Sequence, residues 1–289
     1  MNTTKVNPVV VGVDGSIAGS RTVRFAAGEA LLRGLPLRVV HARTWSAYYG
    51  DPASGGIYTA PLPPDAENRR IVDEAVTMAR RAHPDLRVSG EVIDGSAAVA
   101  LVDESEHAAL ITVGARGRGG VLELMLGSVA VDVVTRARCP VMLVRGEEDI
   151  VSTVVVGVDG TPISREALGF AFAEAAARQV PLHAVHAWSA APNDATAEED
   201  DRQRTERLLE SWMSQWQDTY PTVETTALPI QSTDVTTTLV DASAKASLLV
   251  VGSRMRGELR ARLLGSTAFA LAHTSKCPLA IVRASGQHH

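Results

Sequence analysis

The chain is 289 residues long, 45% hydrophobic and 21% charged, which is typical of a soluble globular protein of about two domains. Its net charge of −5 gives no electrostatic basis for non-specific binding to nucleic acid. No apolar run approaches the roughly 20 residues that cross a bilayer. Residues 1–8 also lack the apolar segment of a secretory signal. We therefore expect a cytoplasmic protein that binds neither nucleic acid nor membranes.

Strands and helices are predicted to alternate along the first half. The β-branched run from Val9 to Val13 is typical of a strand covered on both faces. Asp14-Gly15-Ser16 then turns the chain into a helix that ends at Gly34. The predicted strands are 8–13, 36–42, 86–93, 109–113 and 140–145, and the predicted helices are 17–33, 65–83, 96–107 and 128–137. Such alternation indicates right-handed crossovers and a parallel sheet.

The second half repeats the first. Val154-Val-Val-Gly-Val-Asp-Gly-Thr161 matches Val9-Val-Val-Gly-Val-Asp-Gly-Ser16, and Cys277-Pro278 matches Cys139-Pro140. Its predicted strands are 153–158, 181–187, 222–228, 248–252 and 278–283, and its predicted helices are 162–178, 198–219, 234–246 and 266–274. We predict two tandem domains, residues 1–146 and 152–286. Each is a doubly wound, five-stranded parallel sheet of the Rossmann-like, adenine nucleotide α-hydrolase-like α/β class.

A glycine-rich loop leads from a strand to a helix in each half. The first copy contains Gly114, Gly117, Gly119 and Gly127-Ser128, and the second contains Gly252, Gly257 and Gly265-Ser266. Glycine permits positive φ and close approach to a ligand. A helix N-terminus, which we expect Ser128 to cap, favours an anion. Because ligands of open α/β sheets lie beyond the carboxyl ends of the strands, Asp14, Ala42 and this loop are predicted to share one crevice.

Simpler interpretations compete with this one, and the motifs of other activities are missing or incomplete. Asp14 would also suit a helix cap, and the loop would also suit a flexible connection. The segment Gly12-Val-Asp-Gly15 does not supply the G-x-G-x-x-G of a dinucleotide site, and the sequence contains no Walker P-loop. Gly157 stands where a haloacid-dehalogenase phosphatase would place its nucleophilic aspartate. His41 and His186 have no Ser or Cys nucleophile motif near them.

The spacing Gly-x2-Gly-x9-Gly-Ser at Gly114, together with the opening Val-Gly-Val-Asp-Gly-Ser, resembles a universal stress protein of the ATP-binding type. The resemblance covers nearly the whole chain, once per half, as in the tandem form of actinobacteria. It implies ATP held between the first strand's Asp, the main chain after the second strand and the glycine-rich loop, and we expect Mg²⁺ with ATP in the first half. Asp14 and Ala42 would then address the adenosine end, and the ribose and phosphates would meet Gly114, Gly117, Gly119, Gly127, Ser128 and Val129.

The same resemblance implies a regulator of stress response, dormancy or growth without strong catalytic activity, acting on a protein partner that is unknown. A slow ATP hydrolase and a nucleotide-free interaction scaffold stay open as alternatives.

The second half departs from the motif at two positions. Met255 stands where Gly117 stands, and Glu258 stands where Gly120 stands. Methionine would be strained if Gly117 uses a positive φ, and a carboxylate would repel phosphates in the absence of a cation. The remaining candidates there are Asp159, Ala187, Gly252, Gly257, Gly265 and Ser266. We therefore expect weaker nucleotide binding in the second half.

The ends of the two halves predict how they assemble. An apolar final strand left at a sheet edge invites pairing. We therefore expect residues 141–145 and 279–283 to face each other in an intramolecular pseudo-dimer, with a homodimer formed through an outer face. Cys139 and Cys277, the only cysteines, precede these strands without metal-ligand spacing, and we interpret both as small buried hydrophobic residues.

Overall fold

The computed structural model describes residues 6–43, 65–117, 126–145, 153–189, 195–253 and 264–283. The chain divides into two compact units. Among the described residues, the first unit contains 6–117 and 127–133, and the second contains 126 and everything from Val134 onward. The division falls inside the last helix of the first repeat, so the final strand of that repeat belongs to the second unit.

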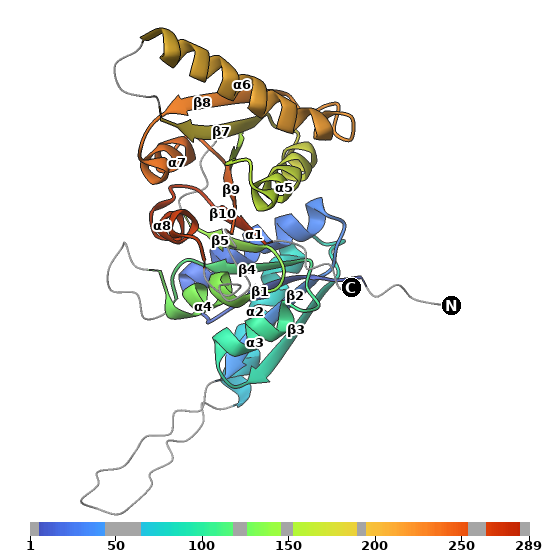
Figure 1. Ribbon diagram of the computed structural model, residues 1–289. Helices are drawn as coiled ribbons and strands as arrows, with labels where there is room; N and C mark the ends of the chain where they lie inside the picture. Colours follow the sequence, from blue (N-terminus) through green and yellow to red (C-terminus); the bar gives the residue numbers. More distant parts are fainter. Residues whose placement is uncertain are drawn as a thin grey trace, which may run out of the picture. The chain divides into compact units, whose positions relative to one another are not determined.

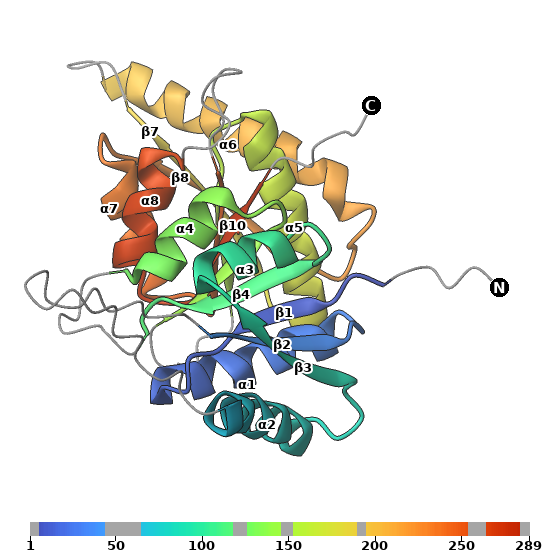
Figure 2. The same cartoon turned by 90° about the horizontal axis from the view of Figure 1, so that it is seen from below.

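The first unit is a parallel sheet with helices on both faces (Figure 1). Its strands run in the order β3-β2-β1-β4, with bounds β1 Val9–Gly12, β2 Leu37–Arg43, β3 Val88–Asp94 and β4 Leu110–Gly114. Its helices are α1 Ile17–Leu32, α2 Asp65–Ala82, α3 Ala97–Glu104 and the start of α4 Ser128–Arg136. Figure 2 shows α1 and α2 on one side of these strands and α3 on the other. This is the doubly wound arrangement predicted from the alternation of elements.

Local chemistry explains why α1 begins and ends where it does. Ser16 is the N-cap, and its Oγ accepts the N–H of Gly19 at 3.0 Å. The chain leaves the helix at Gly34, whose φ of 63° is costly for a residue with a side chain. In the preceding strand, Val9, Val10 and Val11 are 0% exposed, as expected for a strand covered on both faces.

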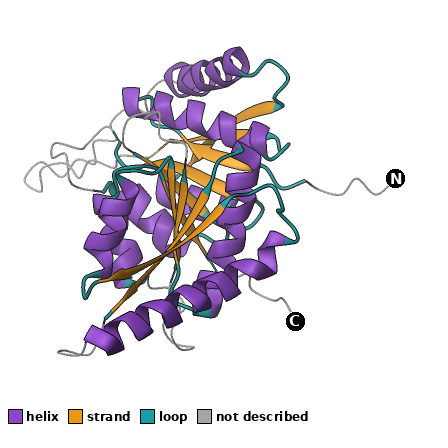
Figure 3. Cartoon of the chain, turned by 90° about the horizontal axis from the view of Figure 1, so that it is seen from above, coloured by secondary structure: helices purple, strands orange, loops and turns teal. Residues whose placement is uncertain are grey.

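The second unit repeats the pattern and adds one strand. The strand order is β5-β10-β9-β6-β7-β8, with bounds β5 Val141–Val144, β6 Val154–Gly157, β7 Leu182–Trp188, β8 Thr225–Gln231, β9 Leu248–Gly252 and β10 Leu279–Val282. Its own helices are α5 Pro162–Arg178, α6 Ala195–Gln217, α7 Val235–Ser243 and α8 Ser266–Thr274. Helix α5 packs beside α6 and α7 packs beside α8, and Figure 3 shows helices on both sides of the strands.

The added strand is the last strand of the first repeat. β5 pairs with β10 in antiparallel register, joining Val141 to Ile281, Met142 to Ala280 and Leu143 to Leu279. All six side chains are 0% exposed. The predicted pairing of the two final strands is therefore confirmed, and the pairing hides two apolar edges that would otherwise be open to association.

Both cysteines are buried at the entrances to these strands, and neither forms a disulfide. Burial raises the pKa of the Cys277 thiol to about 11, against weaker opposing effects of a hydrogen bond from Ser275 and of the Arg145 charge. A thiol with so high a pKa is a poor nucleophile and metal ligand. This agrees with the interpretation of Cys277 as a small buried hydrophobic residue.

The observed element bounds differ from the predicted ones by a few residues. The helix predicted for 96–107 ends at Glu104, because Glu106 and His107 donate their N–H groups to the carbonyls only three residues earlier, Asp103 and Glu104. No helix within the described residues is long and apolar enough to cross a membrane.

Candidate functional site

Asp14 lies at the carboxyl end of β1, where the strand turns into α1. Its Oδ1 accepts the N–H of Ser16 at 3.0 Å, and the helix cap itself is Ser16. In the second repeat, Oδ1 of Asp159 accepts the N–H of Thr161 at 3.1 Å and its hydroxyl at 2.5 Å, and Thr161 is the cap of α5. The simpler interpretation of Asp14 as the N-cap is therefore wrong, because the residue two positions later caps the helix.

The glycine-rich loop of the first repeat returns to this aspartate. A Cβ atom built at Gly117 would lie 2.8 Å from Oδ2 of Asp14. The exit of the loop is tied to its entrance, because the N–H of Gly127 donates to the carbonyl of Ala115 at 3.0 Å. Asp14, Gly117 and Gly127, three of the residues predicted to share the crevice, therefore lie close together.

The reason for glycine at position 117 differs from the one expected. The glycines with positive φ in the described chain are Gly15, Gly34, Gly95 and Gly160, and Gly117 is not among them. The structure requires glycine there because of close approach to the Asp14 carboxylate, not because of a left-handed backbone. The expectation that Met255 would be strained by a positive φ therefore fails. What excludes a side chain at position 117 is the steric clash of its Cβ with Oδ2 of Asp14.

The helix after the loop also begins differently from the prediction. Ser128 is the first residue of α4 and not its cap, and in the second repeat the N-cap of α8 is Gly265, with no side-chain hydrogen bond. A glycine cap has no side chain to accept the first N–H groups of the helix. Those N–H groups therefore stay available to an anion, which strengthens the original inference from a helix N-terminus.

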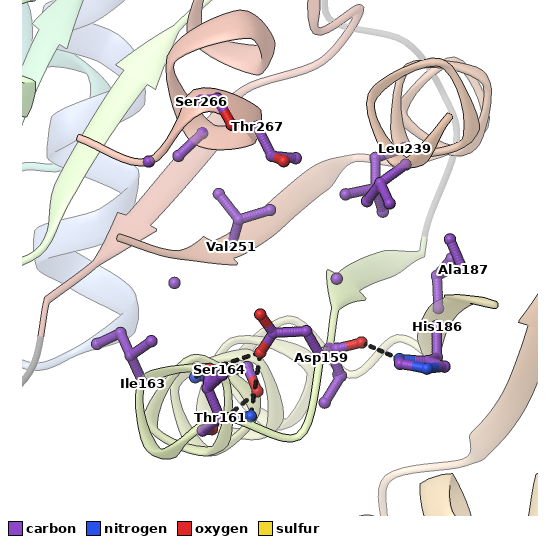
Figure 4. A pocket seen from close by; sticks show the side chains of 17 residues that line it. Asp159, Thr161, Ile163, Ser164, His186, Ala187, Leu239, Val251, Ser266 and Thr267 are labelled. Atoms are coloured by element: carbon purple, nitrogen blue, oxygen red, sulfur yellow. Dashed lines mark hydrogen bonds between the residues drawn. The ribbon is translucent and has the colours of Figure 1, made fainter. Parts of the chain in front are cut away.

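A pocket of about 120 Å³ opens in the second repeat where these segments meet (Figure 4). Its polar lining comes from Asp159, Thr161, Ser164, His186, Ser266 and Thr267. Its apolar lining includes Val158, Ile163, Val185, Val235, Leu239 and Val251. An apolar pocket with a few convergent polar groups is the usual form of a small-molecule site.

The structure collects five of the predicted residues of the second repeat in this one pocket: Asp159, Ala187, Gly252, Gly265 and Ser266. Gly257, Met255 and Glu258 lie outside the described residues, as does Gly119 in the first repeat. Ala42 is in β2 beside Ile93 of β3, and Val129 is the second residue of α4. Thr267, the second-repeat equivalent of Val129, lines the pocket. In the first repeat, Gly114 is the last residue of β4.

Comparison with known proteins decides the family. A model of the universal stress protein family matches residues 5–145 and again residues 151–283. The chain belongs to the universal stress protein family. As a tandem member, it is 34% identical to Universal stress protein Rv2005c of Mycobacterium tuberculosis, over 97% of this chain and 98% of that protein. A universal stress protein of Mycolicibacterium smegmatis is 31% identical over 95% of this chain and 96% of its own. The predicted resemblance to the actinobacterial tandem form is confirmed.

Solved structures confirm the fold class. The crystal structure of a universal stress protein from Archaeoglobus fulgidus superposes with a TM-score of 0.67, at 18% identity, over 96% of each chain. At this identity the likeness concerns the fold alone. Because the family model matches each half of the chain, both predicted domains are universal stress protein domains, while the exact boundaries at 146 and 152 stay a prediction.

Two equivalent histidines, one in each repeat, support the site in this universal stress protein. The Nδ1 of His41 lies 2.8 Å from the carbonyl of Val13, and the Nδ1 of His186 lies 2.6 Å from the carbonyl of Val158. Each bond ties the end of one strand to the residue just before Asp14 or Asp159. The sequence signal for these positions is the recurrence of His-Ala, at 41–42 and at 186–187, at the end of the second strand of each repeat.

Proposed function

We propose that this universal stress protein is an ATP-binding regulatory protein whose nucleotide sites lie at the strand ends of each repeat. The observation that carries the proposal is the pocket of the second repeat. One partly apolar pocket is lined by the second-repeat equivalents of the predicted nucleotide-binding residues. The glycine-capped N-terminus of α8 lines the same pocket.

In the first repeat the residues fit a bound nucleotide. A side chain at residue 117 would clash with Asp14, so glycine keeps side-chain atoms out of this end of the crevice. We propose that Asp14 and the main chain of Ala42 hold the adenosine end, and that Gly114, Gly117, Gly127, Ser128 and Val129 surround the ribose and phosphates. Gly119 completes this set from outside the described residues.

The proposal includes Mg²⁺ with ATP. The polar residues that line the described part of the equivalent pocket are a carboxylate, hydroxyls and an imidazole, with no Lys or Arg among them. Phosphate charge would therefore be balanced by helix N–H groups and by a cation that the phosphates themselves hold. When bound, Mg²⁺ would offset about half of the triphosphate charge.

We propose a binding role and not an efficient enzyme. Asp14 accepts the N–H of Ser16 with Oδ1, and its Oδ2 lies beside Gly117, so the carboxylate is held at the turn between β1 and α1. This favours a structural contact with the ligand over general-base work. The bound nucleotide would then act by changing the surface that contacts a protein partner in stress response or growth control. The assembled state in this proposal is a homodimer.

The direct test is the ligand that the protein carries. Freshly purified full chain is denatured, and the released small molecules are identified by mass spectrometry. We expect ATP at a stoichiometry near one per chain, and we expect Asp14→Ala to lose it. Nucleotide-free protein that also shows no calorimetric binding of Mg·ATP would overturn the proposal and leave the scaffold alternative. ADP formation abolished by Asp14→Ala would instead establish the slow hydrolase.

A further inference from the structure

The first residue after β10 reaches the last helix of the other repeat. Nη2 of Arg283 donates a hydrogen bond to the carbonyl of Val134 in α4, and both residues belong to the second compact unit. Val134 is one of the last four residues of α4, and the carbonyls of these four have no partner within the helix. A side chain of the second repeat therefore satisfies the carboxyl end of a first-repeat helix.

The antiparallel pairing of β5 and β10 explains this crossing. In that register each strand ends beside the start of the other. Arg283 accordingly interacts electrostatically with Cys139, which precedes β5. The equivalent residue of the first repeat, Arg145, interacts in the same way with Cys277, which precedes β10. Each final arginine is thus placed against the other repeat.

The guanidinium of Arg283 is held in a partly desolvated position. Burial lowers the pKa of this group, against an opposing effect of Cys139, yet an arginine remains positively charged at neutral pH. Its Nε is buried and has no hydrogen-bond partner in the part of the chain that the structure describes. The contact with α4 offsets this cost, because the carboxyl end of a helix carries a partial negative charge.

The other end of α4 leads into the nucleotide site proposed for the first repeat. Ser128 begins the helix, about 9 Å along its axis from Val134. The N–H of Val131 donates to the carbonyl of Gly127 at 3.0 Å, and the N–H of Gly127 donates to the carbonyl of Ala115 at 3.0 Å. The start of α4 is therefore tied to the entrance of the glycine-rich loop, and its end is tied to the second repeat.

Two physical effects connect Arg283 with a phosphate at the start of this helix. The hydrogen bond to Val134 fixes one end of a helix of only nine residues, so it limits the movement of the N–H groups at the other end. The positive charge attracts an anion at the N-terminus of the same helix, and partial burial weakens the screening of that attraction by salt.

We propose that Arg283 is a positioning residue for the nucleotide site of the first repeat. It fixes α4 from its carboxyl end and supplies a positive charge that favours phosphates at the N-terminus. The proposal rests on the nucleotide-binding function proposed above, and it adds that the second repeat sets the affinity of the first for phosphorylated ligands. A neutral ligand such as adenosine gains nothing from that charge.

The test measures how the first repeat of the full chain binds a charged and a neutral ligand. Arg283→Met keeps a long side chain but removes both the charge and the hydrogen-bond donor. Titrations with Mg·ATP and with adenosine are followed through the backbone ¹H–¹⁵N signal of Val129, in the first turn of α4. We expect the affinity for Mg·ATP to fall about threefold to tenfold, and the affinity for adenosine to change by less than about twofold.

A matched control lies at the same end of the same helix. Arg136 is in the last turn of α4 but is exposed, so Arg136→Met removes a cation that water and salt already screen. This variant should change the affinity for Mg·ATP by less than about twofold. Arg283→Lys, which retains the charge, should recover most of the affinity that Arg283→Met loses. If Arg283→Met does not fold, Arg283→Gln keeps an N–H donor for the carbonyl of Val134 and should show the loss for Mg·ATP in its place.

The outcomes decide the proposal. Equal losses of affinity for Mg·ATP and for adenosine would show that Arg283 only maintains the fold, and unchanged affinity for both would show that its effect does not reach the site. Either result overturns the positioning role while nucleotide binding stands, as does a loss in Arg136→Met that equals the loss in Arg283→Met. A Val129 signal that does not respond to Mg·ATP in the unmodified protein would overturn the proposed function of the first repeat as well.

Discussion

Gly117 lies so close to Asp14 that there is room between them for a hydrogen atom but not for a methyl group. The Cβ of any larger residue at 117 would lie 2.8 Å from Oδ2 of the aspartate, well inside van der Waals contact. The described ends of the same loop are joined by the bond from the N–H of Gly127 to the carbonyl of Ala115. A side chain at residue 117 would therefore have to displace the Asp14 carboxylate or the backbone beside it.

The first prediction concerns this contact. Gly117→Ala should weaken ATP binding in the first repeat by at least tenfold, about 1.4 kcal/mol, because the new methyl group displaces Asp14 or the loop. Isothermal titration calorimetry with Mg·ATP measures the effect. Gly28→Ala is the matched control, since a Cβ at Gly28 in α1 meets no atom within 4 Å. Equal loss of affinity in both variants would contradict the assignment.

The second prediction concerns the unequal repeats. Met255 and Glu258 replace glycines of the first loop, and in the first repeat a Cβ at Gly117, the position equivalent to Met255, would lie 2.8 Å from Oδ2 of Asp14. The double variant Met255→Gly, Glu258→Gly should raise the affinity of the second repeat for ATP. Nucleotide occupancy in crystals grown without added ligand should be higher in the first repeat. Equal occupancy in the unmodified protein would refute the prediction.

The third prediction concerns the paired final strands. Leu143 and Leu279 face each other in the β5–β10 register, and both are 0% exposed. Leu143→Glu places an unpaired charge in this core and should unfold the chain or lower the melting temperature by many degrees. Leu143→Ala, which loses only packing, should cost about 2–5 kcal/mol. An unchanged melting temperature for the glutamate variant would show that the pairing does not hold the unit together.

The fourth prediction concerns alkaline pH. Burial raises the pKa of Cys277 from about 9 to about 11, so the folded state keeps its proton where the unfolded state has lost it. The stabilisation is full below pH 9 and is lost as the pH rises toward 11, by roughly 2–3 kcal/mol in total. Urea unfolding across this range should show the decline, and Cys277→Ala should flatten it. Cys139→Ala, with Cys277 intact, should retain this contribution.

Much of the architecture follows from the sequence by itself. Valine-rich runs at 9–13 and 154–158 predict buried parallel strands because a strand covered by helices on both faces has no polar side. Repetition of Asp-Gly and of Gly-Ser at matching intervals predicts two equivalent domains and the residues that gather at their strand ends. These inferences succeed because they depend on local periodicity and on the rule that parallel strands end at one edge of the sheet.

Other features were decided only by tertiary structure. Whether glycine is needed for its φ or for its small size depends on which atom lies opposite, and Asp14 is about a hundred residues away from Gly117 in the chain. The same holds for His41 and His186, which look alike in sequence. Nε2 of His41 meets Oδ1 of Asn68 at 3.1 Å, whereas the ring of His186 packs edge-on against Trp212. Steric fit and hydrogen-bond partnership are properties of residues brought together by folding, and neither has a period or a spacing that the sequence displays.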